Sequence, residues 1–343
     1  MPSKLEKPRR ATVKDVAERA GVSRSTVSRV LSCPTLARPV TRAKVRRAIK
    51  DLAYQPCPIA RGLATGTVPF IHVLVSDIRN PFYAELARGV EDVAREHGYA
   101  AVFANTDDSP ERELECLEYT NKLHFAGLIM MSAAGRVDLK RAVTKLNRPV
   151  VLVNRIVPGL TTDAVILNNE YGGYLATKYL ISLGHRRIGH LAGIQKSSAS
   201  AARNQGFIKA MKEEGLDIPQ GAILQGDLRL SSGEAVGRRL VQEGLKYTAI
   251  FSANDQMAIG LISAFEREGL QVPGDVSVVG FDDIAYAKLP RIQLTTVRQP
   301  SYEMSRAAMN MLLEQLGQQN SVCRTMRFEP ELVIRSTCAA PKS

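Results

Sequence analysis

The sequence predicts a small all-α helix-turn-helix headpiece, followed by an α/β core of two doubly wound parallel-sheet lobes. Three observations support this fold class. Residues 12–31 have the pattern of two short helices joined by a tight turn. Most of the net positive charge lies before residue 67. From Phe70 onward, short apolar runs alternate with amphipathic segments, which is typical of βαβ units.

The segment TVKDVAERAGVSRSTVSRVL, residues 12–31, predicts the helix-turn-helix. Thr12 is a good N-cap, and Asp15 lies in the positive first turn of the helix. Gly21 is able to adopt the positive φ that ends this helix, and Ser23 caps the next one. Apolar residues recur at helical spacing and predict one core, made of Val13, Val16, Ala17, Ala20, Val22, Val27, Val30 and Leu31.

The same pattern leaves Arg24, Ser25, Ser28 and Arg29 on the outward face of the second helix. A helix that presents two arginines and small hydroxyls fits the DNA major groove, where arginine recognises guanine O6 and N7. The alternative interpretation is an ordinary helical hairpin on a protein surface. The charge distribution favours DNA.

The charge of the chain is concentrated near its N-terminus. Residues 1–66 hold 15 Lys and Arg against 4 Asp and Glu, so they carry +11 of the net +12. A basic module on a near-neutral body is typical of nucleic-acid binding, and its phosphate contacts make the affinity depend strongly on salt. An anionic membrane is the alternative partner, but the segment lacks the aromatic and leucine-rich face that an interfacial helix needs.

The composition excludes several classes of protein. The 343 residues are 45% hydrophobic, which is enough for more than one core, but no apolar run is long enough to cross a bilayer. No hydrophobic region follows the basic start, so we expect no signal peptide and a cytoplasmic protein. The five cysteines are scattered and never have the spacing of a zinc site. We expect neither a metal nor a cofactor.

The rest of the N-terminal region divides into an arm, a third helix and a linker. Residues 1–10 are interpreted as a flexible basic arm, and a third helix following Thr41 completes a headpiece over residues 11–55. Prolines and glycines punctuate residues 56–69, which we interpret as a hinge. Its middle, Ile59–Ala64, is long enough for only about a turn and a half of helix, so we expect it to fold conditionally.

Residues 70–338 form the predicted core. Its apolar runs predict strands at Ile71–Val75, Ala100–Ala104, Leu128–Met131, Val150–Val153, Ile188–Leu191, Ile250–Ala253 and Val276–Phe281. The helices are expected to end at glycines, namely Gly98, Gly184, Gly215, Gly269 and Gly317. The predicted strand–helix units are too many for one sheet, so we expect two lobes. The first is expected over about 70–162 and 293–322, and the second over about 163–290 and 323–338. A ligand is expected between the lobes, at the carboxyl ends of the strands.

Several motifs recur along the chain in one order. In the headpiece and linker they are VKDVAERAGVSRSTVSRVL, YQP and IARGLATG, and in the core NPFY, LVNR, NNEYGGYLATKYLISLGHRRIGHLAG, ANDQMAIG, VSVVGFDD and LTTVRQP. Over residues 11–335 the chain thereby resembles the lactose-repressor (LacI/GalR) family of bacterial transcription regulators. The core also resembles periplasmic sugar-binding proteins, particularly the ribose-binding type, so a periplasmic-binding-protein-like core is expected.

The resemblance implies a homodimer, or a dimer of dimers, that binds a pseudo-palindromic DNA operator. It implies that the second helix recognises a half-site and that a hinge leucine wedges into the central base step. Cys57-Pro58 stands where many members have Asn and a flexible residue, so an Asn-type cap is lost. The short end after Arg335 favours a dimer. The expected DNA-binding residues are Thr12, Ser23, Arg24, Ser25, Thr26, Ser28, Arg29, Ile59, Ala60 and Leu63.

The resemblance also implies an effector pocket for a monosaccharide, sugar acid or sugar phosphate. Amide, guanidinium and carboxylate groups around aromatic rings suit a sugar, because unpaired buried hydroxyls are costly. Asn154 stands where ribose binders carry Asp, while Arg155 and Arg203 remain, so we expect a positive cleft that favours an anionic ligand. Leu228 stands near a position where an aromatic ring often stacks. The expected pocket residues are Asn80, Phe82, Tyr83, Asn154, Arg155, Arg203, Asn254, Asp282 and Gln299.

The predicted function is a sequence-specific DNA-binding transcription regulator, a repressor whose operator affinity is controlled by a small sugar-type effector. The resemblance favours induction, and linkage requires operator DNA to change the effector affinity by the same factor. We expect no enzyme, because the sequence has no phosphate loop, dinucleotide fingerprint, zinc-binding helix or nucleophile elbow. The alternative is a transport-type sugar-binding protein without a regulatory role, which the basic headpiece disfavours.

Overall fold

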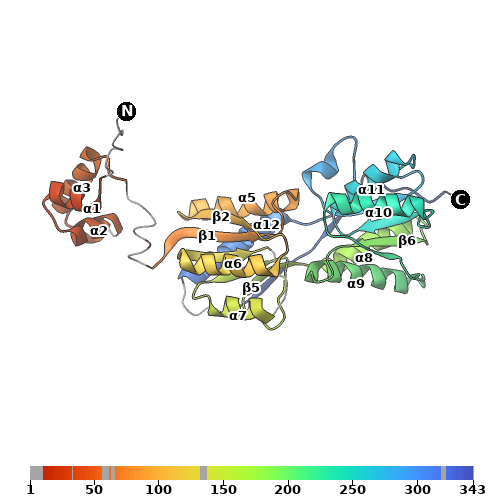
Figure 1. The fold of residues 1–343 in the computed structure, drawn as a ribbon, viewed down its shortest axis with the longest axis horizontal. Coiled ribbons are helices and arrows are strands. Elements are labelled where there is room, and N and C mark those ends of the chain that lie inside the picture. Colours follow the sequence, from red (N-terminus) through yellow and green to blue (C-terminus); the bar gives the residue numbers. More distant parts are fainter. Residues whose placement is uncertain are drawn as a thin grey trace, which may run out of the picture. The chain divides into compact units, whose positions relative to one another are not determined.

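The computed structural model of the chain describes residues 11–32, 34–55, 62, 66–131, 137–317 and 322–342. The chain divides into two units, residues 1–68 and residues 69–343, whose elements are labelled in Figure 1. Within the described ranges, no helix is long and apolar enough to cross a membrane. The predicted arm and the hinge residues Cys57, Pro58, Ile59, Ala60 and Leu63 lie outside the described residues, so those expectations stay predictions.

The helices of the first unit begin where the local sequence predicts, with one exception. Thr12 and Asp15 form a reciprocal capping box at the first helix, and Gly21 ends it with a φ of 66°. The Ser23 hydroxyl accepts a hydrogen bond from the backbone N–H of Thr26 (3.1 Å) and caps the second helix. The elements are α1 (Val13–Ala20), α2 (Arg24–Ser32), the 3₁₀ turn η1 (Pro34–Leu36) and α3 (Pro39–Asp51).

The exception is the start of α3, which was expected after Thr41. The helix begins at Pro39, because proline fits the first helical turn, where its missing N–H needs no partner. The predicted apolar face forms the headpiece core. Its buried members are Val16, Ala17, Ala20, Val27, Val30, Val45 and Ala48, and Val13, Val22 and Leu31 pack against them.

The first lobe of the second unit contains a sheet with the strand order β11-β5-β4-β3-β1-β2. Two helices, α5 (Pro81–Glu96) and α12 (Ser301–Gly317), pack together on one face, while α6 (Pro110–Lys122) and α7 (Val137–Lys145) cover the other (Figure 1). The strands are β1 (Val68–Val75), β2 (Ala100–Asn105), β3 (Phe125–Met130), β4 (Val150–Val153), β5 (Asp163–Leu167) and β11 (Thr325–Phe328).

The second lobe contains a sheet with the order β12-β10-β9-β8-β6-β7, in which β12 pairs antiparallel with β10 and the other pairs are parallel. Its helices are α8 (Asn169–Ser182), α9 (Ser198–Glu213), α10 (Leu230–Gln242), α11 (Asp255–Arg267) and the short η2 (Ala285–Lys288). Its strands are β6 (Ile188–Ala192), β7 (Ile223–Gln225), β8 (Ala249–Ser252), β9 (Ser277–Asp282), β10 (Thr295–Arg298) and β12 (Glu331–Val333). The prediction of two doubly wound lobes is confirmed.

The central strands are covered on both faces, which explains why their sequences are apolar at consecutive positions. In β1, Val73 and Val75 belong to the apolar core on the side of α5. Leu74, between them, belongs to the separate core under α6 and α7.

Four of the five glycines predicted to end helices have a positive φ, between 65° and 97°. They are Gly98, Gly184, Gly215 and Gly269, and glycine suits these positions because it has no Cβ to clash in the left-handed region. Helix α12 also ends at Gly317, but this glycine is the last helical residue and not a left-handed C′ residue, so only the predicted cap position was wrong.

The chain passes between the lobes after β5, after β10 and between β11 and β12. The predicted lobe boundaries were therefore wrong for three strands, since β5 and β11 belong to the first lobe and β10 to the second. The cause is long-range pairing: β5 lies between β4 and β11, and β10 lies between β9 and β12. The local sequence does not encode these partners.

His190 is buried in the second lobe as a neutral ring. It stacks on Phe251 and Phe207, with ring centroids 4.6 and 5.2 Å away, and its Nδ1 lies 3.0 Å from the Phe251 carbonyl oxygen. Burial lowers its pKa from 6.5 to about 4. Between these values the unfolded chain binds more protons than the folded one. The stability that this group contributes is therefore full above pH 6.5 and lost as the pH falls toward 4.

We predict that the unfolding free energy of the wild type, relative to that of the His190→Gln variant, falls by roughly 3 kcal/mol between pH 7 and 4. Glutamine retains a donor for the Phe251 carbonyl but does not titrate, and all other groups cancel in the difference. Urea denaturation of both proteins at several pH values measures it. A difference that stays constant with pH contradicts the assignment.

Candidate functional site

The exposed face of α2 carries the predicted DNA-binding residues of the headpiece. Ser23, Arg24, Ser25, Ser28 and Arg29 are exposed, while Thr26 is half-buried. The Ser23 hydroxyl lies 2.8 Å from the hydroxyls of both Ser25 and Thr26. Thr12 is exposed as well, but its hydroxyl already takes part in the capping box of α1. The helix thus presents two guanidinium groups beside a cluster of hydroxyls.

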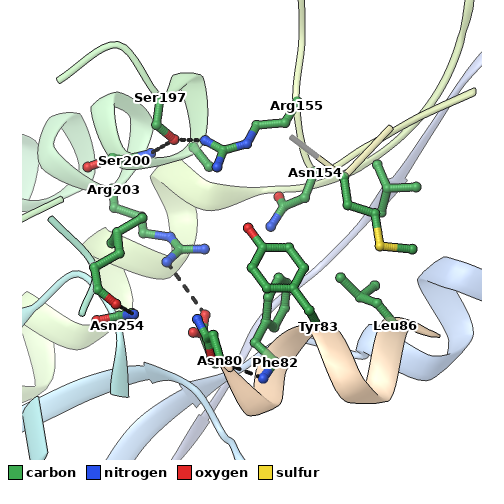
Figure 2. Close-up of a pocket in the computed structure, with 15 residues that line it drawn as sticks. Asn80, Phe82, Tyr83, Leu86, Asn154, Arg155, Ser197, Ser200, Arg203 and Asn254 are labelled. Atoms are coloured by element: carbon green, nitrogen blue, oxygen red, sulfur yellow. Dashed lines mark hydrogen bonds and ion pairs between the residues drawn. The ribbon is translucent and has the colours of Figure 1, made fainter. Parts of the chain in front are cut away.

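A cavity lies between the two lobes, where the predicted effector residues meet (Figure 2). Eight of the predicted residues line it: Asn80, Phe82, Tyr83, Asn154, Arg155, Arg203, Asn254 and Asp282. Gln299 does not line it, because its side chain is buried behind Asn154 and Asp282 and bonds to both.

Two of the amides have a double role because they stand between a strand and a helix. Asn80 follows β1 and caps α5, its Oδ1 accepting a hydrogen bond from the Phe82 N–H (3.1 Å). Asn254 follows β8 and caps α11 in the same way, with the Met257 N–H as donor (3.0 Å). The need for a cap at the carboxyl end of a strand therefore also places an amide at the cavity.

The side chain of Arg203, from α9, is deeply buried at the cavity. Its Nε donates to the Asn169 Oδ1 (2.9 Å) and its Nη1 to the Ala253 carbonyl (2.5 Å), and the guanidinium lies 3.7 Å from the ring centroid of Phe281. Its Nη1 is 3.6 Å from the Asp282 Oδ1. Burial lowers the pKa of Arg203 to about 10, so it stays charged at neutral pH. Burial also raises the pKa of Asp282, to about 6, and Arg203 opposes that shift.

Arg155 joins the lobes on another wall of the cavity. It donates from Nη1 to the hydroxyl of Ser197, and its Nη2 lies 3.8 Å from Asp108. Each of the two cavity arginines therefore has a carboxylate neighbour. The expected surplus of positive charge is reduced: Arg155, Arg203 and Asp282 line the cavity, and Asp108, which the prediction did not foresee, lies beside Arg155 in the adjoining groove.

The cavity also has members that the sequence prediction missed. Three of them lie at the first turn of α9: Ser197, Ala199 and Ser200. They belong to the small-residue segment before Arg203, and their closeness to Arg203 in the sequence could have identified them. Three apolar members give no such signal, since in the sequence they resemble any core residue: Leu86, Met131 and Val153. Leu228, which the resemblance placed near a stacking position, also lines the cavity.

The cavity has a free volume of only about 40 Å³, which is room for a few water molecules. It continues into a groove of about 310 Å³ that shares Asn80, Tyr83 and Leu228 with it. Across this groove Asp77, after β1, pairs with Arg229 of the second lobe (3.5 Å). Hydrogen bonds from Arg79, more than those from Arg229, lower the pKa of Asp77 to about 2. The cavity as it stands therefore has room for water but not for a larger ligand.

Comparison with known proteins identifies the family. Residues 12–57 match the family of bacterial regulatory proteins described as the lacI family, and residues 177–338 match the periplasmic binding protein-like domain. The HTH-type transcriptional repressor PurR of Photobacterium profundum is 36% identical over 328 residues, which cover 95% of this chain and 98% of that protein. The chain belongs to the LacI family.

Solved structures of transcription regulators have the same fold. A Lac repressor dimer bound to operator and the anti-inducer ONPF matches with a TM-score of 0.84 and 28% identity, over 97% of this chain and all of that one. A complex of the transcriptional regulator CelR with cellobiose matches with a TM-score of 0.73 and 30% identity, over 96% and 100%. This LacI-family protein is therefore a DNA-binding transcriptional repressor with an effector-binding domain, and not an enzyme.

Proposed function

We propose that this repressor binds a pseudo-palindromic operator as a homodimer and releases it when a small neutral sugar enters the cavity between its lobes. The observation that carries the proposal is the composition of the cavity wall. Amides, two guanidinium groups and a carboxylate lie there beside two aromatic rings, and both arginines have carboxylate neighbours.

For the operator, the support is the outward face of α2. Arg24 and Arg29 are exposed on the first and second turns of a helix whose other face is held by the headpiece core. Recognition helices of this kind contact base edges with their N-terminal residues, and arginine pairs with guanine. Two-fold symmetry of a dimer then matches a two-fold symmetric operator.

For the effector, the charge balance favours a neutral sugar over the acid or phosphate expected from the sequence. An anion in the cavity faces Asp282 as well as the arginines, and Asp108 of the adjoining groove offsets part of the charge of Arg155, so the anion gains little net attraction. Hydroxyl groups, in contrast, both donate and accept, and they pair with carboxylate, amide and guanidinium alike. The CelR complex with cellobiose gives a precedent for a sugar within this family.

A thermal-shift screen of the full chain against pentoses, hexoses, disaccharides, sugar acids, sugar phosphates and purines tests the effector class. A neutral sugar in large excess over its Kd should raise the stability by about 3 kcal/mol, with saturation. The same sugar should weaken operator binding in a fluorescence anisotropy titration at constant salt.

Other outcomes are equally informative. A saturable shift with sugar acids or sugar phosphates alone overturns the neutral assignment, and one with purines alone overturns the sugar class. A neutral sugar that strengthens operator binding overturns induction and makes the ligand a corepressor.

A further inference from the structure

Five buried polar side chains form a closed ring behind the cavity wall. Arg203 Nε donates to Asn169 Oδ1, Asn169 Nδ2 to Asn154 Oδ1, and Asn154 Nδ2 to Gln299 Oε1, each over 2.9 Å. Gln299 Nε2 donates to Asp282 Oδ1 (2.5 Å), which lies 3.6 Å from Arg203 Nη1 and closes the ring. All five residues are at most 8% exposed.

The ring crosses the boundary between the lobes twice. Asn169 begins α8, directly after β5 has left the first lobe, and Gln299 follows β10 on the way back to α12. Neither residue lines the cavity, whereas Asn154, Arg203 and Asp282 do. Two residues on the connecting segments thereby hold three residues of the cavity wall.

The chemistry of the ring allows only one direction for its hydrogen bonds. A guanidinium is only a donor and an ionised carboxylate only an acceptor, so Arg203 and Asp282 fix the two ends of the series. Each of the three amides between them must then accept from the Arg203 side and donate toward Asp282. If the oxygen and the NH₂ group of any one amide exchanged places, two donors would meet at one of its contacts and two acceptors at the other.

We propose that Asn169 and Gln299 are positioning residues of the effector pocket, which orient Asn154, Arg203 and Asp282 to bind adjacent hydroxyl groups of a neutral ligand. The inference rests on the proposed function and specifies its ligand chemistry. Within the described chain, no hydrogen bond uses Asp282 Oδ2 or Arg203 Nη2. An oxygen acceptor and a guanidinium donor at one cavity wall suit two neighbouring hydroxyls, one donating and one accepting.

The variant Gln299→Glu tests the ring because its effect depends on protonation. Once ionised, the introduced carboxylate cannot donate to Asp282 and repels it, so the ring opens. Once protonated, it accepts from Asn154 and donates to Asp282, as glutamine does. The charged or titratable groups around it are the same in the wild type. They are Asp282, Arg203 and Asp255 and, around the pocket that Gln299 lines on its other side, Glu85, Asp283, Lys288, Arg298, Tyr302 and Glu303.

The experiment is calorimetric titration of the full chain with D-ribose and with cellobiose at pH values from 6.5 to 8, where Asp282, with a pKa of about 6, is mainly ionised. At pH 8, Gln299→Glu is expected to bind the sugar at least about tenfold more weakly than the wild type, because a buried acceptor faces another acceptor. Its affinity relative to the wild type should recover as the pH falls to 6.5. Asn169→Asp, which accepts from Arg203 but cannot donate to Asn154, should weaken binding similarly.

Gln315→Glu is the matched control. Gln315 is half-buried and also donates to a buried carboxylate, Asp163 (2.6 Å), but in the first lobe and away from the cavity. It should lower stability and leave sugar affinity unchanged. Wild-type affinity in Gln299→Glu at pH 8, or a loss as large in Gln315→Glu, overturns the proposal.

If neither sugar binds to the wild type, the sugar class of the proposed function fails, and the ring is tested without ligand. The unfolding free energies of Asn169→Ala, Gln299→Ala and the double variant then form a thermodynamic cycle. Coupling between these two residues, which do not contact each other, supports the ring that joins them through Asn154. Strictly additive effects overturn it.

Discussion

Replacing Arg203 with alanine should abolish the response of the repressor to its effector and leave its operator affinity unchanged. The guanidinium makes two hydrogen bonds, stacks on Phe281 and faces Asp282. Its loss removes a charged contact worth about 1.5–3 kcal/mol to a ligand. It also leaves Asp282 buried beside no cation, and breaking such a pair costs about 3–5 kcal/mol of stability.

The measurement is operator affinity by fluorescence anisotropy, with and without the sugar found in the stability screen. The wild type should lose operator affinity when sugar is added, and Arg203→Ala should not. Lys209→Ala, an exposed residue of the same helix with a long 3.9 Å pair to Glu170, should behave as the wild type. Arg203→Lys retains the positive charge beside Asp282 and therefore avoids the stability loss expected for Arg203→Ala. A lost sugar response in Arg203→Lys is then not caused by unfolding. A normal sugar response in Arg203→Ala contradicts the role given to this residue.

The headpiece was predictable because its signals are local. A cap, a first-turn acid and a glycine with positive φ act within one or two turns of helix, and Thr12, Asp15 and Gly21 do so here. The same holds for the core strands that are apolar at consecutive positions. The start of α3 at Pro39 differs from the predicted start after Thr41, because Pro39 and the residue after Thr41 were both suitable as the first helical residue.

The distribution of strands between the lobes was not predictable in the same way. Three strands, β5, β10 and β11, are short. Each joins its sheet through partners that are distant in the sequence, or from which it is separated by a segment that passes to the other lobe. Nothing within the strands themselves distinguishes the two sheets.

The residues of the candidate site also differ in whether a local sequence signal identifies them. Asn80 and Asn254 were identifiable because a polar residue between a strand and a helix lies at the ligand edge of a parallel sheet. Asn169 was not, since an asparagine beside the helix cap Asn168 is indistinguishable from a second capping residue. Its partners Asn154 and Arg203 are 15 and 34 residues away, and only the folded structure brings the three together.

Replacing Arg24 with alanine should weaken operator binding strongly and selectively. Arg24 is exposed as the first residue of α2, where a recognition helix meets base edges. One bidentate arginine–guanine pair is worth about 1–3 kcal/mol, and a symmetric dimer makes it twice, so a loss of roughly 2–6 kcal/mol is expected. The loss should be confined to one base pair in each half-site, at which the variant no longer discriminates.

Selection of operators from a randomised library by the wild type, followed by anisotropy titrations of both proteins on each single-base change, measures this. Lys44→Ala on α3 is the control, since Lys44 is an exposed cation outside α2. If it contacts a phosphate, its replacement lowers affinity equally on all sequences and reduces the salt slope by about one. The same uniform loss in Arg24→Ala contradicts base recognition, because a phosphate carries no sequence information. α2 would then contribute to affinity through this residue, and specificity would have to come from Ser25, Ser28 or Arg29 on the same exposed face.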